Sequence, residues 1–166
     1  MAQVPVSRPG APAPSEAMER EQPPVVTVSV RGTDALREYV PKDGILTVSH
    51  PEPVLLATRA QITGYFEEVT HFWREYCGGR KVYVLVDYDN LSTNSDELEW
   101  YGAAVKRFAD ECALDIVRYN GNMVQRMNGR LIAIQIHAPS NLYSSRDEAL
   151  AVVAGLRRGT IKSVPP

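Results

Sequence analysis

An aspartate pair follows an apolar run near the middle of the chain. The run KVYVLV ends at Val86, and Asp87 and Asp89 come directly after it with one residue between them. Carboxylate oxygens are the ligands that Mg²⁺ prefers in proteins. Two carboxylates at a strand end therefore make a Mg²⁺-dependent nuclease or phosphatase, with Asp87 and Asp89 as the metal ligands, one hypothesis for this protein.

The next residues concentrate hydroxyl, amide and carboxyl groups. The polar side chains in question are Asn90, Ser92, Thr93, Ser95 and Asp96. Such side chains cap helices by accepting hydrogen bonds from free backbone N–H groups. Their number exceeds what one cap needs, so the segment from Asn90 to Asp96 is predicted to be the partner-binding or regulatory site.

Other kinds of site have weaker support. The sequence contains no glycine-rich phosphate-binding motif. The histidines His50, His71 and His137 lie far apart and show no metal-ligand spacing. Arg118, Arg126 and Arg130 form the one locally basic stretch, which could hold an anion or a nucleic-acid backbone. No cofactor and no structural metal are expected.

Composition restricts the class of protein. The chain has 166 residues, 44% of them hydrophobic, and a net charge of −2, which favours one globular domain without nonspecific nucleic-acid binding. No apolar run is long enough to cross a bilayer. The N-terminus has no apolar signal-peptide core, so a cytoplasmic protein is expected. Cys77 and Cys112 are predicted to be ordinary thiols at the ends of two helices.

The elements that position these groups follow from periodicity. Residues 1–24 hold six of the 12 prolines and predict a flexible tail, residues 25–159 form the domain, and residues 160–166 form a short C-terminal tail. Expected strands cover 25–31, 45–49, 81–86, 114–119 and 140–143, the first two as a hairpin. Expected helices follow Thr58, the polar segment after Asp87, Asn122 and Ser145.

Two of the expected helices depend on apolar stripes. Ile62, Phe66, Val69, Trp73 and Tyr76 recur at helical spacing in the first. Residues 122–137 fit either a helix, through Val124, Met127, Leu131 and Ile134, or a strand, and the helix is favoured because Pro139 ends the segment. The alternation predicts an α/β domain, with a mixed, mostly parallel sheet of four to five strands covered by about four helices.

Two segments, VYVLVDYDNL and NLYSSRDEAL, together with this element order, resemble the STAS domains of SpoIIAA-like anti-sigma-factor antagonists over residues 25–157. The resemblance implies a non-enzymatic module that docks a partner protein through the loop after the central strand. In that family a serine at the next helix start is often phosphorylated. Asp96 occupies its position here and Ser95 the position of the preceding aspartate, so a simple phospho-switch at that position is not available, and Asp96 could act as a permanent negative charge near the helix start.

The segment VDYDNL also looks like the metal-binding strand end of NYN/PIN-type ribonucleases and like the aspartate pair of haloacid-dehalogenase-like phosphatases. The further acids and the lysine that those chemistries need do not form a convincing set. The favoured expectation is therefore a STAS-like regulatory module that is not an enzyme. Its partner is another protein, neither a membrane nor a specific nucleic acid is expected, and homo-oligomerisation is left open.

Overall fold

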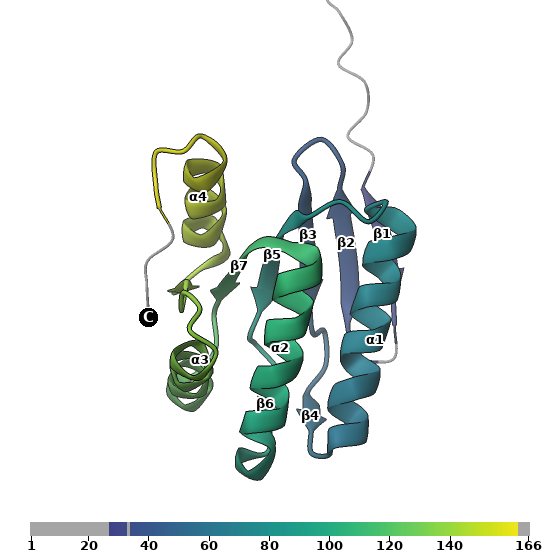
Figure 1. The fold of residues 1–166 in the computed structure, drawn as a ribbon, viewed down its shortest axis with the longest axis vertical. Helices are drawn as coiled ribbons and strands as arrows, with labels where there is room; N and C mark the ends of the chain where they lie inside the picture. The colour runs from purple at the N-terminus through teal and green to yellow at the C-terminus, as the bar shows by residue number, and fades with distance from the viewer. Residues whose placement is uncertain (1–26, 33, 163–166) are drawn as a thin grey trace, which may run out of the picture.

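A mixed sheet of six strands organises the chain (Figure 1). The computed structural model describes residues 27–32 and 34–162, so the predicted tail over 1–24 and the last four residues lie outside the described residues. The strands are β1 (Val28–Arg31), β2 (Leu36–Val40), β3 (Ile45–Ser49), β5 (Val82–Asp87), β7 (Ala113–Tyr119) and β8 (Leu142–Tyr143). Their spatial order is β1-β2-β3-β5-β7-β8.

The sheet is antiparallel at one end and parallel at the other. β1 pairs with β2 and β2 with β3 in antiparallel ladders, whereas β3, β5, β7 and β8 run parallel. The α/β prediction is confirmed, but the sheet is larger than the four to five strands expected. The predicted hairpin between 25–31 and 45–49 is wrong, because β2 lies between these two strands and pairs with both.

Two further strands form a separate small sheet. β4 (Val54–Leu56) and β6 (Leu91–Thr93) pair in parallel, and neither was predicted. The helices are α1 (Arg59–Tyr76), α2 (Leu98–Cys112), α3 (Met123–Gln135) and α4 (Arg146–Arg157), and a 3-10 turn, η1 (Ser95–Glu97), precedes α2. The preference for a helix over 122–137 is confirmed.

The two faces of the parallel strands contribute to two cores. Val84 on β5 and Ile116 on β7 join the larger core beneath α1 and α2, while their neighbours Leu85 and Val117 join a smaller core beneath α4. This alternation is the period-2 pattern of strands buried on both faces. The continuous apolar run of β5 is thereby explained.

α1 begins and packs largely as predicted. Thr58 and Gln61 form a complete capping box, and Gly78 and Gly79 adopt positive φ after the helix ends. Within the predicted stripe, Ile62, Val69 and Trp73 are buried. Phe66 is half-buried and Tyr76 is exposed, so these two do not belong to the sealed core.

Cys77 and Cys112 are buried free thiols at the ends of α1 and α2. Burial raises the pKa of Cys77 to about 11 and that of Cys112 to about 12. Both therefore remain protonated near neutral pH, as expected for thiols that fill core space. Across the described ranges, no helix combines the length and the apolar character that spanning a bilayer requires.

Candidate partner-docking surface

The carboxyl ends of the parallel strands meet at one edge of the sheet. β3 leads to His50, β5 ends at Asp87, and β7 leads to Asn120. In open α/β sheets this edge collects binding groups, because the sheet fixes loops whose side chains are free to vary. The predicted site residues all follow β5 and therefore lie beyond this edge.

Asp87 joins the ends of β5 and β7. Its Oδ1 accepts hydrogen bonds from the Asp89 backbone N–H and from Asn120 Nδ2, both at 3.0 Å. The buried Tyr119 lies beside it, and burial together with the charge of Asp87 raises the pKa of Tyr119 to about 12. The carboxylate of Asp87 thus connects the turn after β5 to the end of β7 at the sheet edge.

Asp89 is exposed, and its Oδ1 accepts a hydrogen bond from Gly121 N at 3.4 Å. The structure therefore brings Asp87 and Asp89 together at the sheet edge, and both contact the segment after β7. Among the described residues, no group of three or more His, Cys, Asp or Glu side chains gathers in a way that could hold a metal ion.

His50 fixes the end of β3 to the end of β5. Its Nδ1 donates to the Asp87 carbonyl oxygen at 2.9 Å, and its Nε2 accepts from the Tyr65 hydroxyl at 3.0 Å. Burial lowers the pKa of His50, which favours the neutral ring that this donor-and-acceptor pattern requires. The His50 carbonyl in turn accepts from Asn90 Nδ2 at 2.9 Å.

Asn90 adopts a left-handed backbone conformation with φ of 62°. Asparagine tolerates this conformation better than most residues with a Cβ atom. The turn lets the chain leave β5 and pair with β4, and Val54 N donates to Asn90 O at 2.7 Å. Asn90 therefore has a structural role within the predicted docking site.

The rest of the predicted site is more ordered than a loop. Ser92 and Thr93 lie on β6, where Ser92 is exposed and Thr93 half-buried. Ser95 and Asp96 lie on η1, and Asn94 caps this turn by accepting from Asp96 N at 3.3 Å. Asp96 was expected at the helix start, but it lies in the 3-10 turn before Leu98, where α2 begins.

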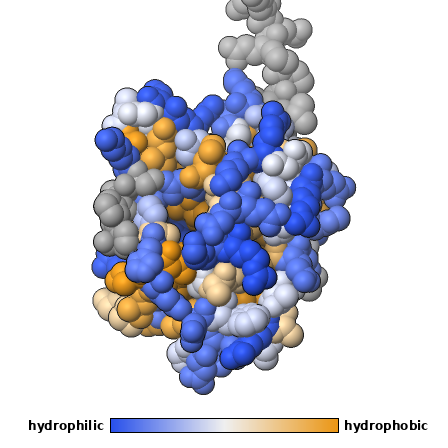
Figure 2. Space-filling view, viewed as in Figure 1, coloured by the Kyte–Doolittle hydropathy of each residue, from blue (hydrophilic) through white to orange (hydrophobic). Residues whose placement is uncertain are grey.

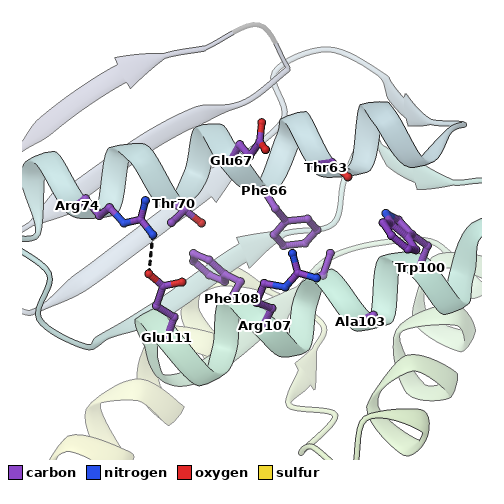
Figure 3. Close-up of a pocket in the computed structure, with 11 residues that line it drawn as sticks. Thr63, Phe66, Glu67, Thr70, Arg74, Trp100, Ala103, Arg107, Phe108 and Glu111 are labelled. Atoms are coloured by element: carbon purple, nitrogen blue, oxygen red, sulfur yellow. Dashed lines mark hydrogen bonds and ion pairs between the residues drawn. The ribbon is translucent and has the colours of Figure 1, made fainter.

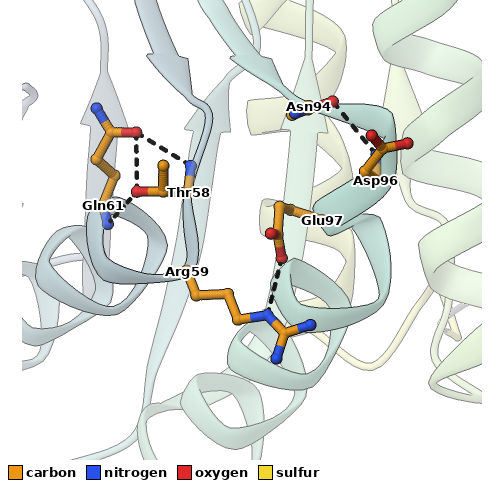
Figure 4. A network of polar contacts seen from close by, with 6 residues as sticks. All are labelled: Thr58, Arg59, Gln61, Asn94, Asp96 and Glu97. Atoms are coloured by element: carbon orange, nitrogen blue, oxygen red, sulfur yellow. Dashed lines mark hydrogen bonds and ion pairs between the residues drawn. The ribbon is translucent and has the colours of Figure 1, made fainter.

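Contacts from α1 hold η1 in place (Figure 4). Arg59, the first residue of α1, donates to Glu97 at 3.1 Å, and its guanidinium lies over the Trp100 ring. No hydrogen bond to another described residue occupies the side chains of Ser92, Ser95 or Asp96. These three groups are exposed and free to bind a partner, although the backbone that carries them is fixed.

A groove separates β6 from α3, and we call it the docking groove. Its volume is about 110 Å³. Gln125 Nε2 crosses it and donates to Leu91 O at 2.7 Å. The lining includes Ser92, Thr93, Leu98, Asn122, Val124, Gln125 and Asn128. Two predicted residues thus line the groove, and the η1 turn with Ser95 and Asp96 lies in the chain between two of its walls, Thr93 and Leu98.

α3 forms the other wall and exposes an apolar surface. Asn122 and Gln125 form a capping box at the start of α3. Gly129 packs so closely against Tyr88 that a Cβ atom added at this residue would lie 3.1 Å from Tyr88 Cε2. Ile132 is buried. The side chains on the opposite side of α3 are between 51% and 85% exposed, and we call them the ridge: Met123, Val124, Met127, Leu131 and Ile134.

Figure 2 shows apolar residues gathered over α3 at the lower left of the molecule. Four ridge residues are the ones that indicated a helix in the sequence, and that stripe faces solvent. The sequence analysis did not identify the ridge as a functional surface. The sequence did contain an indication of this surface. The same segment holds a second apolar set, Ile132 and Ile136, and only one of the two sets can face the core.

The predicted basic stretch does not form one surface. Arg118 is buried and donates to Ser140 O at 3.3 Å, while Arg126 donates to Tyr143 O at 3.1 Å. Arg130 alone of the three is exposed. The alternative that these arginines together hold an anion or a nucleic-acid backbone therefore loses its basis, because two of them bind backbone carbonyls near β8.

A second groove, of about 280 Å³, lies between α1 and α2 (Figure 3). Phe66 and Phe108 point into it from the two helices, with ring centroids 6.1 Å apart. Arg74 and Glu111 close one end with an ion pair at 2.7 Å. Phe66 is half-buried because it forms part of this groove.

In comparisons with known proteins, no protein-family model matches the chain, and no curated protein is significantly similar to it.

Proposed function

We propose that this protein is a non-enzymatic interaction module of STAS-like type, which docks a partner protein through residues 90–96 and the adjoining docking groove. The observation that carries the proposal is the docking groove itself. It lies at the edge where the parallel strands end, and Ser92 and Thr93 line it. Its far wall continues into the apolar ridge of α3, which includes Val124.

The order of elements supports the family assignment. From β3 onwards the strands of the main sheet alternate with helices through α4, with β4 and β6 lying in the connections, and the parallel strands lie side by side in chain order. This is the alternation on which the resemblance to SpoIIAA-like proteins depends. It makes the segment after β5 the connection from a central strand to the next helix, which is where the family docks its partners.

The chemistry of residues 90–96 suits protein recognition. Ser92 and Ser95 offer hydroxyl groups and Asp96 a carboxylate, on a backbone held by the β4 pairing and by the Arg59–Glu97 ion pair. A fixed backbone reduces the entropy lost on binding, so these side chains can contribute to affinity. A phosphate on Ser92, Thr93 or Ser95 would add charge beside Asp96 and alter that affinity.

The aspartate pair has a structural role in this proposal. Asp87 accepts two hydrogen bonds through one oxygen, and Asp89 accepts one from the segment after β7. These contacts shape the platform on which residues 90–96 lie. The competing hypothesis gives the same pair the role of Mg²⁺ ligands in a nuclease or phosphatase.

One experiment compares both hypotheses on purified full-length protein. Partners captured by the wild type are identified, and their affinity is measured for the wild type and for Ser92→Ala with Asp96→Ala. The matched control, Ser144→Ala with Asp147→Ala, changes the same residue types near the start of α4, where both residues are exposed. We expect the first pair to weaken binding by at least about 1.5 kcal/mol, the scale of charge-assisted hydrogen bonds, and the control pair to bind normally.

The enzymatic arm uses the same preparations with Mg²⁺ or Mn²⁺ and either RNA or a phosphate ester. Cleavage by the wild type that disappears in Asp87→Asn would overturn the proposed function. Normal partner binding by the Ser92/Asp96 double variant would remove residues 90–96 from the docking surface.

A further inference from the structure

α3 turns its more apolar side away from the protein. At 100° per residue, the five ridge residues fall within an arc of about 100° on the helix, opposite the buried Gly129, Ile132 and Ala133. Single exposed apolar residues are ordinary, but a contiguous apolar surface of this kind marks an interaction site. The ridge is therefore expected to bind another molecule.

We infer that the ridge binds an amphipathic helix of the partner protein, whose apolar side contacts the ridge and whose border facing Arg130 carries carboxylates. This inference rests on the proposed function and specifies the partner's docking element. Apolar side chains at spacings of three and four on a facing helix match a ridge built from positions 123, 127, 131 and 134.

The charge of α3 indicates which charge the partner's helix should carry. Arg126 and Arg130 are the only charged residues of the helix, and it contains no aspartate or glutamate. Arg126 is held by the Tyr143 carbonyl. Arg130 lies at the border of the ridge, is exposed, and makes no ion pair with another described residue. A carboxylate on the facing helix would complement it.

A second copy of this chain fits the ridge less well. In a two-fold symmetric pair, residues near the axis meet their own copies. The middle of the ridge lies between residues 128 and 129, so each Arg130 would lie close to the other, and α3 supplies no acid to neutralise them.

An anionic membrane is also disfavoured. Asp89 and Asp96 are exposed on the neighbouring segment, and the chain has a net charge of −2. Both features oppose approach to a negatively charged lipid surface. Val124 belongs to the ridge and to the docking groove, on the border of the ridge opposite Arg130. A helix on the ridge would therefore lie beside Ser92 and Thr93 with its uncharged border, and its carboxylates would face Arg130, away from Asp89 and Asp96.

The test uses two synthetic helical peptides, with leucines at spacings of three and four and either glutamates or lysines along the border. Each is titrated into isotope-labelled full-length protein at low salt, and amide chemical shifts are followed. We expect shifts centred on residues 123–134, and an affinity for the glutamate peptide at least about fivefold higher than for the lysine peptide. Arg130→Glu should reverse that order.

Ridge variants provide the second readout. Met127→Gln with Leu131→Gln should weaken glutamate-peptide binding at least about tenfold. Leu114→Gln, which changes a side chain on β7 that is 58% exposed, should leave it unchanged. Equal affinity for the two peptides, or shifts centred outside α3, would overturn the inference.

Two further outcomes would assign the ridge to another occupant and also overturn the inference. One is self-association in sedimentation equilibrium that the ridge variant abolishes, and the other is binding to phosphatidylserine vesicles that the ridge variant abolishes.

Failure of this inference is distinguishable from failure of the proposed function. If the Ser92/Asp96 double variant no longer binds the natural partner but the peptides do not bind the ridge, only this inference fails. If the peptides bind the ridge and the double variant keeps its partner, only the assignment of residues 90–96 fails.

Discussion

Leu131 and Ile132 are neighbours on α3 with opposite environments, so replacing each by alanine tests the orientation of this helix. Ile132 is 4% exposed and packs in the main core, close to Gly102 of α2. Truncation of a buried isoleucine removes its transfer free energy and leaves a cavity, at a cost of about 2–5 kcal/mol. We expect Ile132→Ala to lower the free energy of unfolding by about 3 kcal/mol.

Leu131 is 51% exposed. Full burial of a leucine contributes about 1.5–3 kcal/mol, and half of this side chain already contacts water. Alanine also has a slightly higher helix propensity than leucine. We therefore expect Leu131→Ala to cost less than about 1 kcal/mol.

Urea unfolding followed by circular dichroism measures both free energies, and equal slopes against urea show that the two variants unfold from comparable native states. A loss above about 2 kcal/mol for Leu131→Ala, or a loss below 1 kcal/mol for Ile132→Ala, would refute the orientation of α3. The ridge would then be core, and the inference about its occupant would lose its basis.

Three other predictions concern the sheet edge and the core. The lowered pKa of His50 means that the unfolded chain binds a proton more readily than the folded one, so the free energy of unfolding falls as pH drops below about 6.5, by at most about 1.4 kcal/mol per pH unit. His50→Gln should flatten this dependence in urea unfolding between pH 7 and 5, and an identical pH dependence in the variant would contradict the buried, neutral His50. Asn90 combines φ of 62° with a side-chain hydrogen bond to His50 O, so calorimetry should show a larger loss of melting temperature for Asn90→Ala than for Asn90→Gly, because glycine adopts the left-handed backbone at little cost. The reverse order would contradict a left-handed backbone at this position. With a pKa of about 11 for Cys77 and about 12 for Cys112, both thiols should react with Ellman's reagent far more slowly in native protein at pH 8 than in urea, and equal rates would show that they are exposed.

Strong local signals made most elements predictable. The Thr58–Gln61 capping box and the glycine pair after Cys77 identified both ends of α1, and both are present in the structure. β5 was recognisable because an apolar run bounded by turn residues is typical of a strand buried on both faces. These elements depend on interactions close in sequence, which a single chain displays.

The missed strands lack such signals. On β2 the buried positions are occupied by Arg37 and Tyr39, and Arg37 forms an ion pair with Glu68. A buried charge at an inward position hides the apolar alternation that identifies a strand. β4 and β6 contain three residues each and are stabilised by pairing with one another across a long stretch of chain, which no local pattern reveals.

The proposed docking surface was only partly predictable from the sequence. Ser92 and Thr93 were identified from their chemistry, and they line the groove. The opposite wall comes from α3, about thirty residues later in the chain, and depends on how that helix is rotated. Two apolar stripes competed for the core, and the buried one contains Ile132 and Ile136, which lie beside Gly102 of α2.

The most direct test of the central claim is the dissociation constant of the captured partner protein, measured by titration calorimetry with the wild type and with Ser92→Ala combined with Asp96→Ala. The account predicts at least about a tenfold increase in that constant, with stability changed by no more than the loss of a helix cap. An unchanged constant, or a wild-type Mg²⁺-dependent cleavage of RNA or of a phosphate ester that Asp87→Asn abolishes, would contradict it.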